Sequence, residues 1–362
     1  EPTNHLDLDS IHWLEDFLGR YSGTVICISH DRHFLNNICT HIADIDYQTI
    51  IIYPGGYDDM VLAKTQVRSR IEAENAQRAK KIAQLNDFIA RFAAGTRSSQ
   101  VASRKKEVER LQPSDLARSN IHRPFIRFQL EDPSGRTPLE IEDLAHAYGD
   151  AAPVWKGFRS LVDRGDKIGI MGRNGAGKTT LLRALLKDAP GTFDRESLDG
   201  ATTGGIKWGH NPRIGYFAQD HRTFIDESVT VFEWLQRFDP KASQQELRGL
   251  LGQMLFSGEE GLKQCKALSG GEAARLMFCR LMLEKPNVLI FDEPTNHLDL
   301  ESINALNVAL QKYDGTVLLV THDEDLLDEV ATRIWYVGDG RIEDFKGPYA
   351  EFEKQHQQVG AR

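Results

Sequence analysis

The sequence has few cysteines and no long apolar run. Four cysteines are spread over 362 residues without a CxxC spacing, so neither a zinc site nor a disulfide framework is indicated. They are Cys27, Cys39, Cys265 and Cys279. The most apolar runs, at 288–291 and 316–320, are far shorter than the roughly 18–20 residues that cross a bilayer. No signal-peptide pattern opens the sequence. These absences favour a soluble protein of a reducing compartment, and we expect it in the cytoplasm without a membrane partner.

Negative charge prevails, with 44 Lys and Arg against 53 Asp and Glu and a net charge of −9. This balance argues against a general nucleic-acid binder. The average conceals a basic middle segment. Residues 61–128 hold 15 Lys or Arg and 6 Asp or Glu, a net charge of 15 − 6 = +9. The rest of the chain therefore has a net charge of −9 − 9 = −18. The basic middle either meets an acidic partner or forms a solvated helix face.

A repeat organises the chain. The opening EPTNHLDLDS, residues 1–10, returns as EPTNHLDLES at residues 293–302, an offset of 293 − 1 = 292. Two more matches keep this offset: GTVICISHD at 23–31 with GTVLLVTHD at 315–323, and Tyr57 with Tyr349. Three matches in one register indicate a duplicated domain.

The two copies are unequal, because a long segment before residue 293 belongs to the second copy and nothing precedes the first. We therefore expect a C-terminal piece of a longer protein; a naturally short protein with a vestigial repeat is the alternative. The predicted domains are a remnant of the first copy at 1–59, a basic helical hairpin linker at 60–136, the complete second copy at 137–355 and a tail at 356–362.

The linker has the pattern of two helices. Residues 61–92 lack Pro and Gly, and apolar residues recur there at helical spacing. These are Ile82, Leu85, Ile89 and Phe92. Residues 95–99 supply turn chemistry, and a second helical segment runs to Pro113. It carries Arg104, Lys105, Lys106 and Arg110. We expect an irregular crossing from Pro113 to Pro138 into the complete copy.

The segment GRNGAGKT at 172–179 fits the phosphate-binding pattern GxxxxGK[ST]. A short apolar run at 167–171 predicts a buried strand before it, and residues 180–186 predict a helix after it. Backbone N–H groups and a helix N-terminus would then face the phosphates, with Lys178 on phosphate oxygens and the Thr179 hydroxyl on Mg²⁺. The alternative is an ordinary glycine-rich turn.

Two further motifs follow. The strand predicted at 287–291 ends in Asp292 and Glu293, one carboxylate for a metal shell and one within reach of an attacking water. The segment LSGGE at 268–272 precedes a helical run at 273–283 and forms a second anion-binding nest. Taken alone, the acidic pair is a common strand end and the LSGGE segment an ordinary capped helix. Their order after the phosphate loop favours the functional interpretation.

With these motifs the chain resembles ATP-binding-cassette (ABC) proteins, specifically the ABC-F subfamily, which carries two cassettes on one polypeptide and no membrane domain. The resemblance covers essentially the whole chain, including the linker pattern at 92–111. It implies an α/β fold of the ABC-type P-loop NTPase class: a parallel core sheet, an antiparallel β subdomain and a helical signature subdomain, plus a helical-hairpin linker. The cofactors it implies are ATP and Mg²⁺.

The resemblance also assigns site residues. The implied ATP-binding residues are Tyr148, Gly172, Asn174, Gly175, Ala176, Gly177, Lys178, Thr179 and Thr180. The implied catalytic residues are Glu293 as base, His322 as switch and Gln219 of the Q-loop, and the implied Mg²⁺ ligands are Thr179, Gln219 and Asp292. The implied signature loop holds Ser269, Gly270, Gly271 and Glu272, and the implied D-loop residue is Asp299. In the first copy, Glu1, Asp7 and His30 match base, D-loop and switch.

Single positions have simpler explanations. Tyr148 is either the aromatic that stacks on adenine or a core residue of antiparallel strands expected between 139 and 162. His322 and His30 are either switch residues or helix caps, and Gln219 alone would mean nothing. His210 and His221 have no ligand spacing, and we predict both on the surface.

In the family, cassettes face each other head to tail, and each ATP lies between the phosphate loop of one and the signature loop of the other. The chain should therefore bind ATP yet hydrolyse it weakly, because the first ABC domain that would complete its sites in cis is missing. The resemblance further implies action on the ribosome (rRNA and tRNA) to regulate translation, with the linker near the P-site tRNA. The alternatives are a transporter's nucleotide-binding subunit and an antibiotic-resistance factor that protects ribosomes. Homodimers of the chain also remain open.

Overall fold

A computed structural model describes residues 1–3, 6–46, 49–92, 98–111, 123–149, 151–190 and 198–360. The chain divides into two compact units, one made of Glu1–Phe34 and His122–Arg362 and the other of Leu35–Ile121. These limits differ from the domain boundaries expected at 59/60 and 136/137, which stay predictions. Each unit is described by itself.

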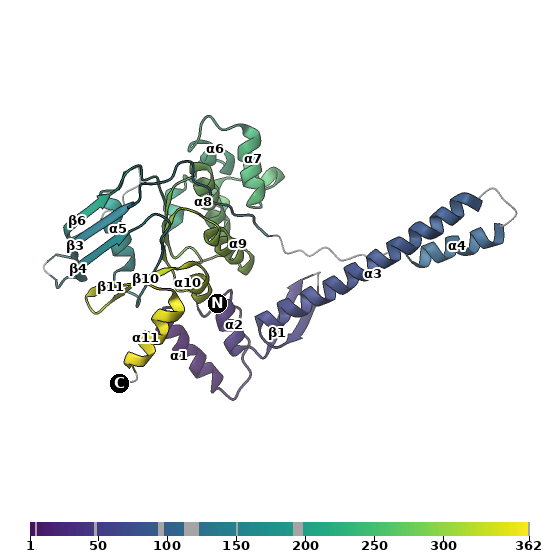
Figure 1. Cartoon of the computed structure of the whole chain (residues 1–362), viewed down its shortest axis with the longest axis horizontal. Helices are drawn as coiled ribbons and strands as arrows, with labels where there is room; N and C mark the ends of the chain where they lie inside the picture. The colour runs from purple at the N-terminus through teal and green to yellow at the C-terminus, as the bar shows by residue number, and fades with distance from the viewer. Residues whose placement is uncertain are drawn as a thin grey trace. The chain divides into compact units, whose positions relative to one another are not determined.

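The larger unit is built on a sheet of order β11-β10-β5-β9-β8-β7, in which β11 alone runs antiparallel to its neighbour. Figure 1 labels the edge strand β11 and the neighbouring β10. Its strands are β5 (Lys167–Met171), β7 (Ile214–Phe217), β8 (Val288–Asp292), β9 (Thr316–Val320), β10 (Arg333–Gly338) and β11 (Arg341–Phe345). The short apolar runs become strands because β8 and β9 are buried along their whole length, as parallel strands covered on both faces are. The predicted strand at 167–171 is confirmed, and the strand predicted at 287–291 is confirmed with bounds one residue later, so that Asp292 is the last residue of β8.

A second sheet is antiparallel, of order β4-β3-β6. Its strands are β3 (Leu139–Ala147), β4 (Trp155–Val162) and β6 (Ala201–Trp208). Alternate side chains of β3 and β4 turn inward, and Leu144 and Trp155 join Ile170 of β5 and Leu181 of α5 (Lys178–Lys187) in one buried cluster. This cluster holds the phosphate-binding end of β5 against the antiparallel sheet.

A helical part completes the cassette. It contains α6 (Val231–Gln236), α7 (Gln244–Gln253), α8 (Gly270–Glu284) and the short 3₁₀ turns η1 (His221–Phe224), η2 (Gly258–Leu262) and η3 (Cys265–Ala267). In its core Phe217 stacks on Phe278, and Phe291 contacts both rings at a tilt. Phe128, from the stretch before β3, packs against Phe278 and Phe291, so the irregular crossing contributes to this core. Together the three parts confirm the predicted fold class.

The remaining helices of this unit belong to the ends of the two repeats. They are α1 (Leu8–Gly19), α9 (Leu300–Gln311), α10 (Glu324–Val330) and α11 (Tyr349–Gly360), with α2 (Arg32–Ile38) crossing into the smaller unit. The repeats differ at one segment: residues 23–28 form no strand, whereas their equivalents at 315–320 include the buried β9. Ile26 and Ile28 are accordingly exposed, because no described strand pairs with them.

The smaller unit holds a hairpin of strands and a hairpin of helices. Its elements are β1 (His41–Asp46), β2 (Thr49–Pro54), α3 (Tyr57–Phe92) and α4 (Ser98–Arg110). Lys64 of α3 pairs with Asp44 at 2.7 Å and Asp46 at 3.4 Å on β1, and Lys81 of α3 pairs with Glu107 of α4 at 2.9 Å. The predicted helical hairpin is confirmed.

The linker helices differ in their bounds from the prediction. Helix α3 begins at Tyr57 rather than at residue 61, and Ser98 and Ser99 belong to α4 rather than to the turn. The predicted turn residue Gly95 lies outside the described residues.

Within the described part of the chain, no helix is both long enough and apolar enough to span a bilayer.

Candidate nucleotide site

The phosphate loop joins β5 to α5 and depends on two glycines. Gly172 has φ +147°, and a Cβ there would lie 2.2 Å from the carbonyl oxygen of Val337. Gly177 has φ +100°, and a Cβ there would lie 2.5 Å from Val154. Only glycine accepts these conformations without strain or collision. The loop can therefore wrap tightly around the start of α5, where backbone N–H groups and the helix dipole favour an anion.

Lys178 is the first residue of α5 and is 6% exposed. Its ammonium donates to the carbonyl oxygens of Gly172 at 2.7 Å and Arg173 at 3.1 Å. Burial lowers its pKa, and the nearby Glu293 and Asp292 carboxylates oppose that shift. The lysine is thus held over its own loop, where an incoming phosphate would replace the carbonyl partners.

Asp292 ends β8 with no exposed surface. Burial raises its pKa to about 7. Its Oδ1 accepts from the Thr179 hydroxyl at 3.3 Å, whereas its Oδ2 is buried without a hydrogen-bond partner. A buried carboxylate oxygen of this kind needs a cation or a donor. The pair therefore fits Mg²⁺, which typically takes one or two carboxylates and completes its octahedron with waters and phosphates.

The described residues contain no cluster of three or more His, Cys, Asp or Glu side chains suited to a metal. At this site the adjacent protein oxygens are those of Asp292 and Thr179, one carboxylate and one hydroxyl. Gln219, also predicted as a ligand, donates its amide to Glu293 instead, at 3.2 Å. Its metal role stays a prediction.

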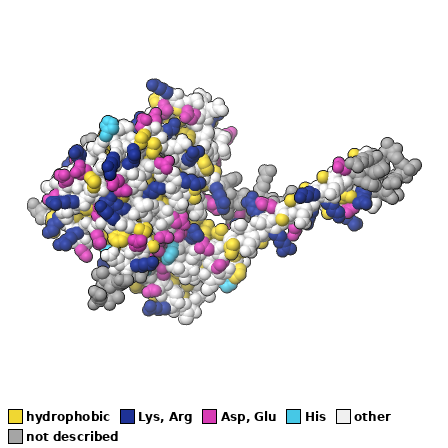
Figure 2. All heavy atoms as spheres, viewed as in Figure 1, with side chains coloured by type: hydrophobic (Ala, Val, Ile, Leu, Met, Phe, Trp, Pro, Cys, Tyr) yellow, Lys and Arg dark blue, Asp and Glu magenta, His cyan; other side chains and the backbone are white. Residues whose placement is uncertain are grey.

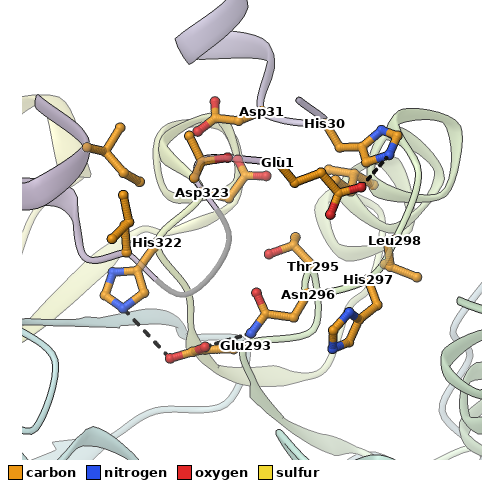
Figure 3. Close-up of a pocket in the computed structure, with 14 residues that line it drawn as sticks. Glu1, His30, Asp31, Glu293, Thr295, Asn296, His297, Leu298, His322 and Asp323 are labelled. Carbon is orange, nitrogen blue, oxygen red and sulfur yellow. Dashed lines mark hydrogen bonds and ion pairs between the residues drawn. The ribbon is translucent and has the colours of Figure 1, made fainter. Parts of the chain in front are cut away.

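Glu293 follows β8 with φ +49°, the left-handed region that costs a non-glycine residue energy and is frequent at functional sites. Its Oε2 accepts from the Asn296 amide at 2.7 Å and from Gln219 at 3.2 Å. Figure 3 shows Glu293 between Asn296 and His322 at the floor of a pocket. The carboxylate is held in place by two amides and still reaches the pocket, as a base acting on water must.

His322 lies just beyond β9, with Nε2 3.7 Å from Glu293 Oε1. Neither ring nitrogen has a hydrogen-bond partner, although both are buried. Burial, and then the Lys178 charge, lower its pKa to about 4. The imidazole is therefore neutral near pH 7 and has one N–H to donate to a ligand in the pocket.

Tyr148 stands beside the loop rather than in the core. Its ring is 42% exposed, its hydroxyl bonds the Thr180 hydroxyl at 2.8 Å, and the ring meets His146 edge to face. Of the two interpretations, burial in the core is wrong for this side chain, and stacking on adenine stays a prediction.

The predicted signature loop forms the start of α8. Ser269 is the N-cap: its hydroxyl accepts from Glu272 N–H at 3.3 Å, and the Glu272 carboxylate accepts from Ser269 N–H at 2.6 Å. Gly271 has no room for a side chain, since its Cβ would lie 2.9 Å from the carbonyl oxygen of His297. Among the described residues, none of Ser269 to Glu272 lines the pocket of Glu293 and His322. The loop is a capped helix start within its own cassette, and its role on a second nucleotide stays a prediction.

The cap has a measurable contribution. We expect Ser269→Ala to lower the free energy of unfolding by about 1 kcal/mol, because the N–H of Glu272 loses its acceptor. Urea unfolding measures this, with Ser103→Ala in the exposed middle of α4 as the matched control. A loss as small as the control's would show that the capping box contributes nothing.

The prediction that His221 lies on the surface is wrong. It is 4% exposed, its ring packs on Phe217 at 4.9 Å, and its Nε2 lies 3.5 Å from the carbonyl oxygen of Gly270. The neighbouring Arg222 donates to the carbonyl oxygen of Leu268. The residues after Gln219 therefore hold the segment that carries Ser269. His210 is exposed, as predicted.

The first copy's residues meet the second copy's loop. Asp7 caps α1 through Ser10 N–H at 3.0 Å, and its other oxygen accepts from Asn174 N–H at 2.9 Å. Burial raises its pKa, but these bonds and the Ser10 hydroxyl outweigh it and bring the pKa to about 2. Asp9 pairs with Arg173 at 2.8 Å. In the second copy Asp299 caps α9 in the same way, through Ser302 N–H at 2.8 Å.

Both copies line one pocket (Figure 3). On the first copy's side His30 lies 3.3 Å from Glu1, as His322 lies 3.7 Å from Glu293 on the other side. The structure thus brings together the predicted base and switch residues of both copies. It also adds Asn296 to the site, which the sequence analysis did not single out.

The pocket holds a carboxyl group whose charge is costly. Burial raises the pKa of Asp323 to about 7, and the Asp31 carboxylate adds to the rise. Since this value exceeds the ordinary 3.8, the group contributes stability at low pH that is lost as the pH rises from about 4 through 7. Its Oδ1 accepts from Leu326 N–H at 3.0 Å, an acceptor that asparagine would keep.

We expect Asp323→Asn to gain stability over wild type between pH 5 and pH 8, by about 2–3 kcal/mol. The charged carboxylate is penalised only at the higher pH, whereas the amide is indifferent to pH. Urea unfolding at both pH values measures this. An identical difference at pH 5 and pH 8 would contradict the assigned titration.

The chain is similar to known proteins over most of its length. Two family models, both described as ABC transporter, match residues 156–296 and residues 43–128. Probable ATP-binding protein YbiT of Escherichia coli O157:H7 is 43% identical over 97% of this chain, and ABC transporter ATP-binding protein YkpA of Bacillus subtilis is 40% identical over 97%. ABC transporter F family member 5 of Arabidopsis thaliana is 35% identical over 96%. The chain belongs to the ABC-F group of ATP-binding-cassette proteins.

This ABC-F chain spans 65%, 64% and 49% of the lengths of those three relatives. The matched segment 156–296 contains the phosphate loop, the signature loop, Asp292 and Glu293, whereas Tyr148, Asp299 and His322 lie outside it. The second segment, 43–128, contains both helices of the hairpin. Asn296 could have been found from the repeat, because it belongs to the EPTNHLD segment that returns at offset 292.

Proposed function

We propose that this ABC-F chain binds ATP with Mg²⁺ at residues 172–180 and supplies the residues that hydrolyse it. Lys178 would bind the β- and γ-phosphate oxygens, and Thr179 and Asp292 would hold the metal, which neutralises phosphate charge. Glu293 would accept a proton from the attacking water, and the neutral His322 would donate to the γ-phosphate. Tyr148 would stack on adenine.

The observation that carries this proposal is a set of buried polar atoms without partners on two residues that both sense the charges of Lys178 and Glu293. Asp292 Oδ2 and both nitrogens of His322 are buried without partners. Burial of polar atoms without hydrogen bonds is costly, so a ligand that supplies partners to them gains affinity there. A Mg²⁺-bound triphosphate offers a cation to Asp292 Oδ2 and an acceptor oxygen to the single N–H of the neutral His322 ring.

We further propose that the whole protein acts in the cytoplasm on the ribosome, where nucleotide occupancy times a step of translation and the hairpin of α3 and α4 lies near tRNA. What supports this is the charge of α4, whose exposed face carries Arg104, Lys105, Lys106 and Arg110 against Glu107 and Glu109. Figure 2 shows Lys and Arg side chains along the hairpin with acidic ones among them. The acidic side chains hold neighbours in place, as Glu107 does for Lys81 and Arg104.

Sedimentation with ribosomes tests the second proposal. We expect the whole protein carrying Glu1→Gln and Glu293→Gln, in Mg²⁺ and ATP at low salt, to co-sediment with ribosomes. Changing Arg104, Lys105 and Lys106 to Gln should weaken this binding at least about tenfold, because phosphate contacts dominate affinity for RNA. The matched control changes three exposed cations of the cassette, Lys156, Arg159 and Lys207, to Gln. No co-sedimentation, or equal losses in both triple variants, would contradict a role for the hairpin on RNA.

A further inference from the structure

The two repeats differ in charge at one pair of positions. The equivalent segments His30-Asp31 and His322-Asp323 are followed by Arg32-His33 in the first copy and by Glu324-Asp325 in the second. The offset of 292 makes Arg32 equivalent to Glu324 and His33 equivalent to Asp325. Both pairs lie at the start of a helix, α2 or α10. A basic pair in one copy thus replaces an acidic pair in the other.

These four residues contact one another crosswise. Arg32 lies 4.0 Å from the Asp325 carboxylate, and His33 Nε2 lies 3.2 Å from Glu324 Oε2. The first position of each copy therefore meets the second position of the other copy. This is the contact pattern of a two-fold interface, in which residue i touches j while j touches i. Asp31 and Asp323, which precede these positions, lie at the same pocket (Figure 3).

Glu324 is the anchor of the contact. Its side chain is 14% exposed, and its Oε1 is 2.7 Å from Nε2 of His12 on α1 and accepts from the Tyr349 hydroxyl at 3.4 Å. The second nitrogen of His33 lies 3.8 Å from Glu15, also on α1. A largely buried carboxylate depends on its partners, because an unpaired charge there would be strongly unfavourable. Two histidines of the first copy supply those partners.

We propose that positions 32, 33, 324 and 325 form a charge code that directs the first repeat to pair with the second and disfavours pairing of either repeat with its own kind. In a pair of second repeats, Glu324 of each would face Asp325 of the other, and four carboxylates would meet. In a pair of first repeats, Arg32 would face His33 twice, and neither side chain would find a carboxylate. Specificity between similar partners commonly uses such repulsion in the wrong complex as well as attraction in the right one.

The first test uses the pairing inside this chain. Arg32→Glu with His33→Asp gives the first repeat the acidic pair of the second, so α1 and α2 should separate from the cassette. We expect the amide hydrogen exchange of α1 to accelerate about tenfold. Adding Glu324→Arg and Asp325→His exchanges the two pairs but leaves the contacts of position 324 with His12 and of position 33 with Glu15 unmatched, so it should slow the exchange again at least about threefold without reaching the wild-type rate. No acceleration in the double variant, or no slowing in the fourfold variant, would overturn the proposal.

The second test concerns a second copy of this chain. Glu324→Arg alone gives the second repeat an arginine and an aspartate, which are complementary across a two-fold axis, so two chains should then pair through these positions. We expect sedimentation velocity to show dimerisation strengthened about tenfold over wild type, and the gain to be lost at high salt. Glu227→Arg, the same change at an exposed glutamate of the helical part, is the matched control. Equal dimerisation in both variants would contradict the code, whatever the outcome for ATP binding.

Discussion

Replacing Glu293 with Gln is expected to leave ATP binding within about twofold of wild type and to lower the rate of hydrolysis about 10²- to 10⁴-fold, the usual contribution of a positioned general base. Glutamine has the same shape and can still accept from the Asn296 amide, which lies 2.7 Å from the carboxylate. What it cannot do is take a proton from water. The change therefore separates the chemical step from binding.

Release of labelled phosphate from ATP measures the rate, because a single cassette should turn over slowly and needs a sensitive assay. Glu227→Gln, at an exposed position, is the matched control and should retain the wild-type rate. If Glu293→Gln hydrolyses ATP as fast as this control, the base lies elsewhere and the assignment of the site is wrong.

The second large effect is expected from Lys178→Ala, which should weaken Mg²⁺–ATP binding about 100-fold, close to 2.7 kcal/mol. Lys178 is 6% exposed, and its ammonium reaches the carbonyl oxygens of the phosphate loop at 2.7 and 3.1 Å. A cation fixed at this place attracts phosphate oxygens in surroundings that screen little. Its removal leaves the charge of the triphosphate to the backbone amides and the metal.

Titration calorimetry with Mg²⁺–ATP measures the affinity, and thermal unfolding of the same samples shows whether the loop has collapsed without its lysine. Lys156→Ala, at an exposed residue of β4, is the control for lost positive charge. Unchanged affinity in a folded Lys178→Ala protein would mean that ATP binds somewhere other than this loop.

Local chemistry made much of this site predictable from the sequence. A short apolar run followed by GRNGAGKT predicts a strand, a tight turn and a helix, and β5, the loop and α5 follow in that order. The glycines of the loop are required by backbone geometry. At Gly172, any side chain would place its Cβ 2.2 Å from the carbonyl oxygen of Val337. The fold class came from the resemblance that these motifs carry, and the apolar runs predicted only single buried strands.

Side-chain environments were less predictable, since they depend on contacts between distant segments. His221 has no distinctive neighbours in sequence, and its burial comes from packing on Phe217 and lying 3.5 Å from the Gly270 carbonyl oxygen. The bond from Asn174 N–H to Asp7 joins residues 167 positions apart. No periodicity reports such a contact, although the repeat did identify Asp7 as a residue of interest.

The charge code depends on the sequence repeat and on the ion pairs of the structure together. The repeat alone makes Arg32 and Glu324 equivalent, but nothing in the sequence says that they share an interface. The ion pairs alone, one of them between the partly exposed Arg32 and Asp325, do not say which repeat pairs with which. The repeat shows that positions 32 and 33 are equivalent to 324 and 325, and the structure shows that they contact each other crosswise. Only both observations together indicate which repeat pairs with which.

The most direct test of the whole account is a structure of this chain with Mg²⁺ and a non-hydrolysable ATP analogue. The account predicts the γ-phosphate within hydrogen-bond distance of the Lys178 ammonium and the His322 ring, and the metal on the Thr179 hydroxyl and Asp292 Oδ2. A nucleotide bound away from the 172–180 loop, or a metal that leaves Asp292 Oδ2 without a partner, would contradict it.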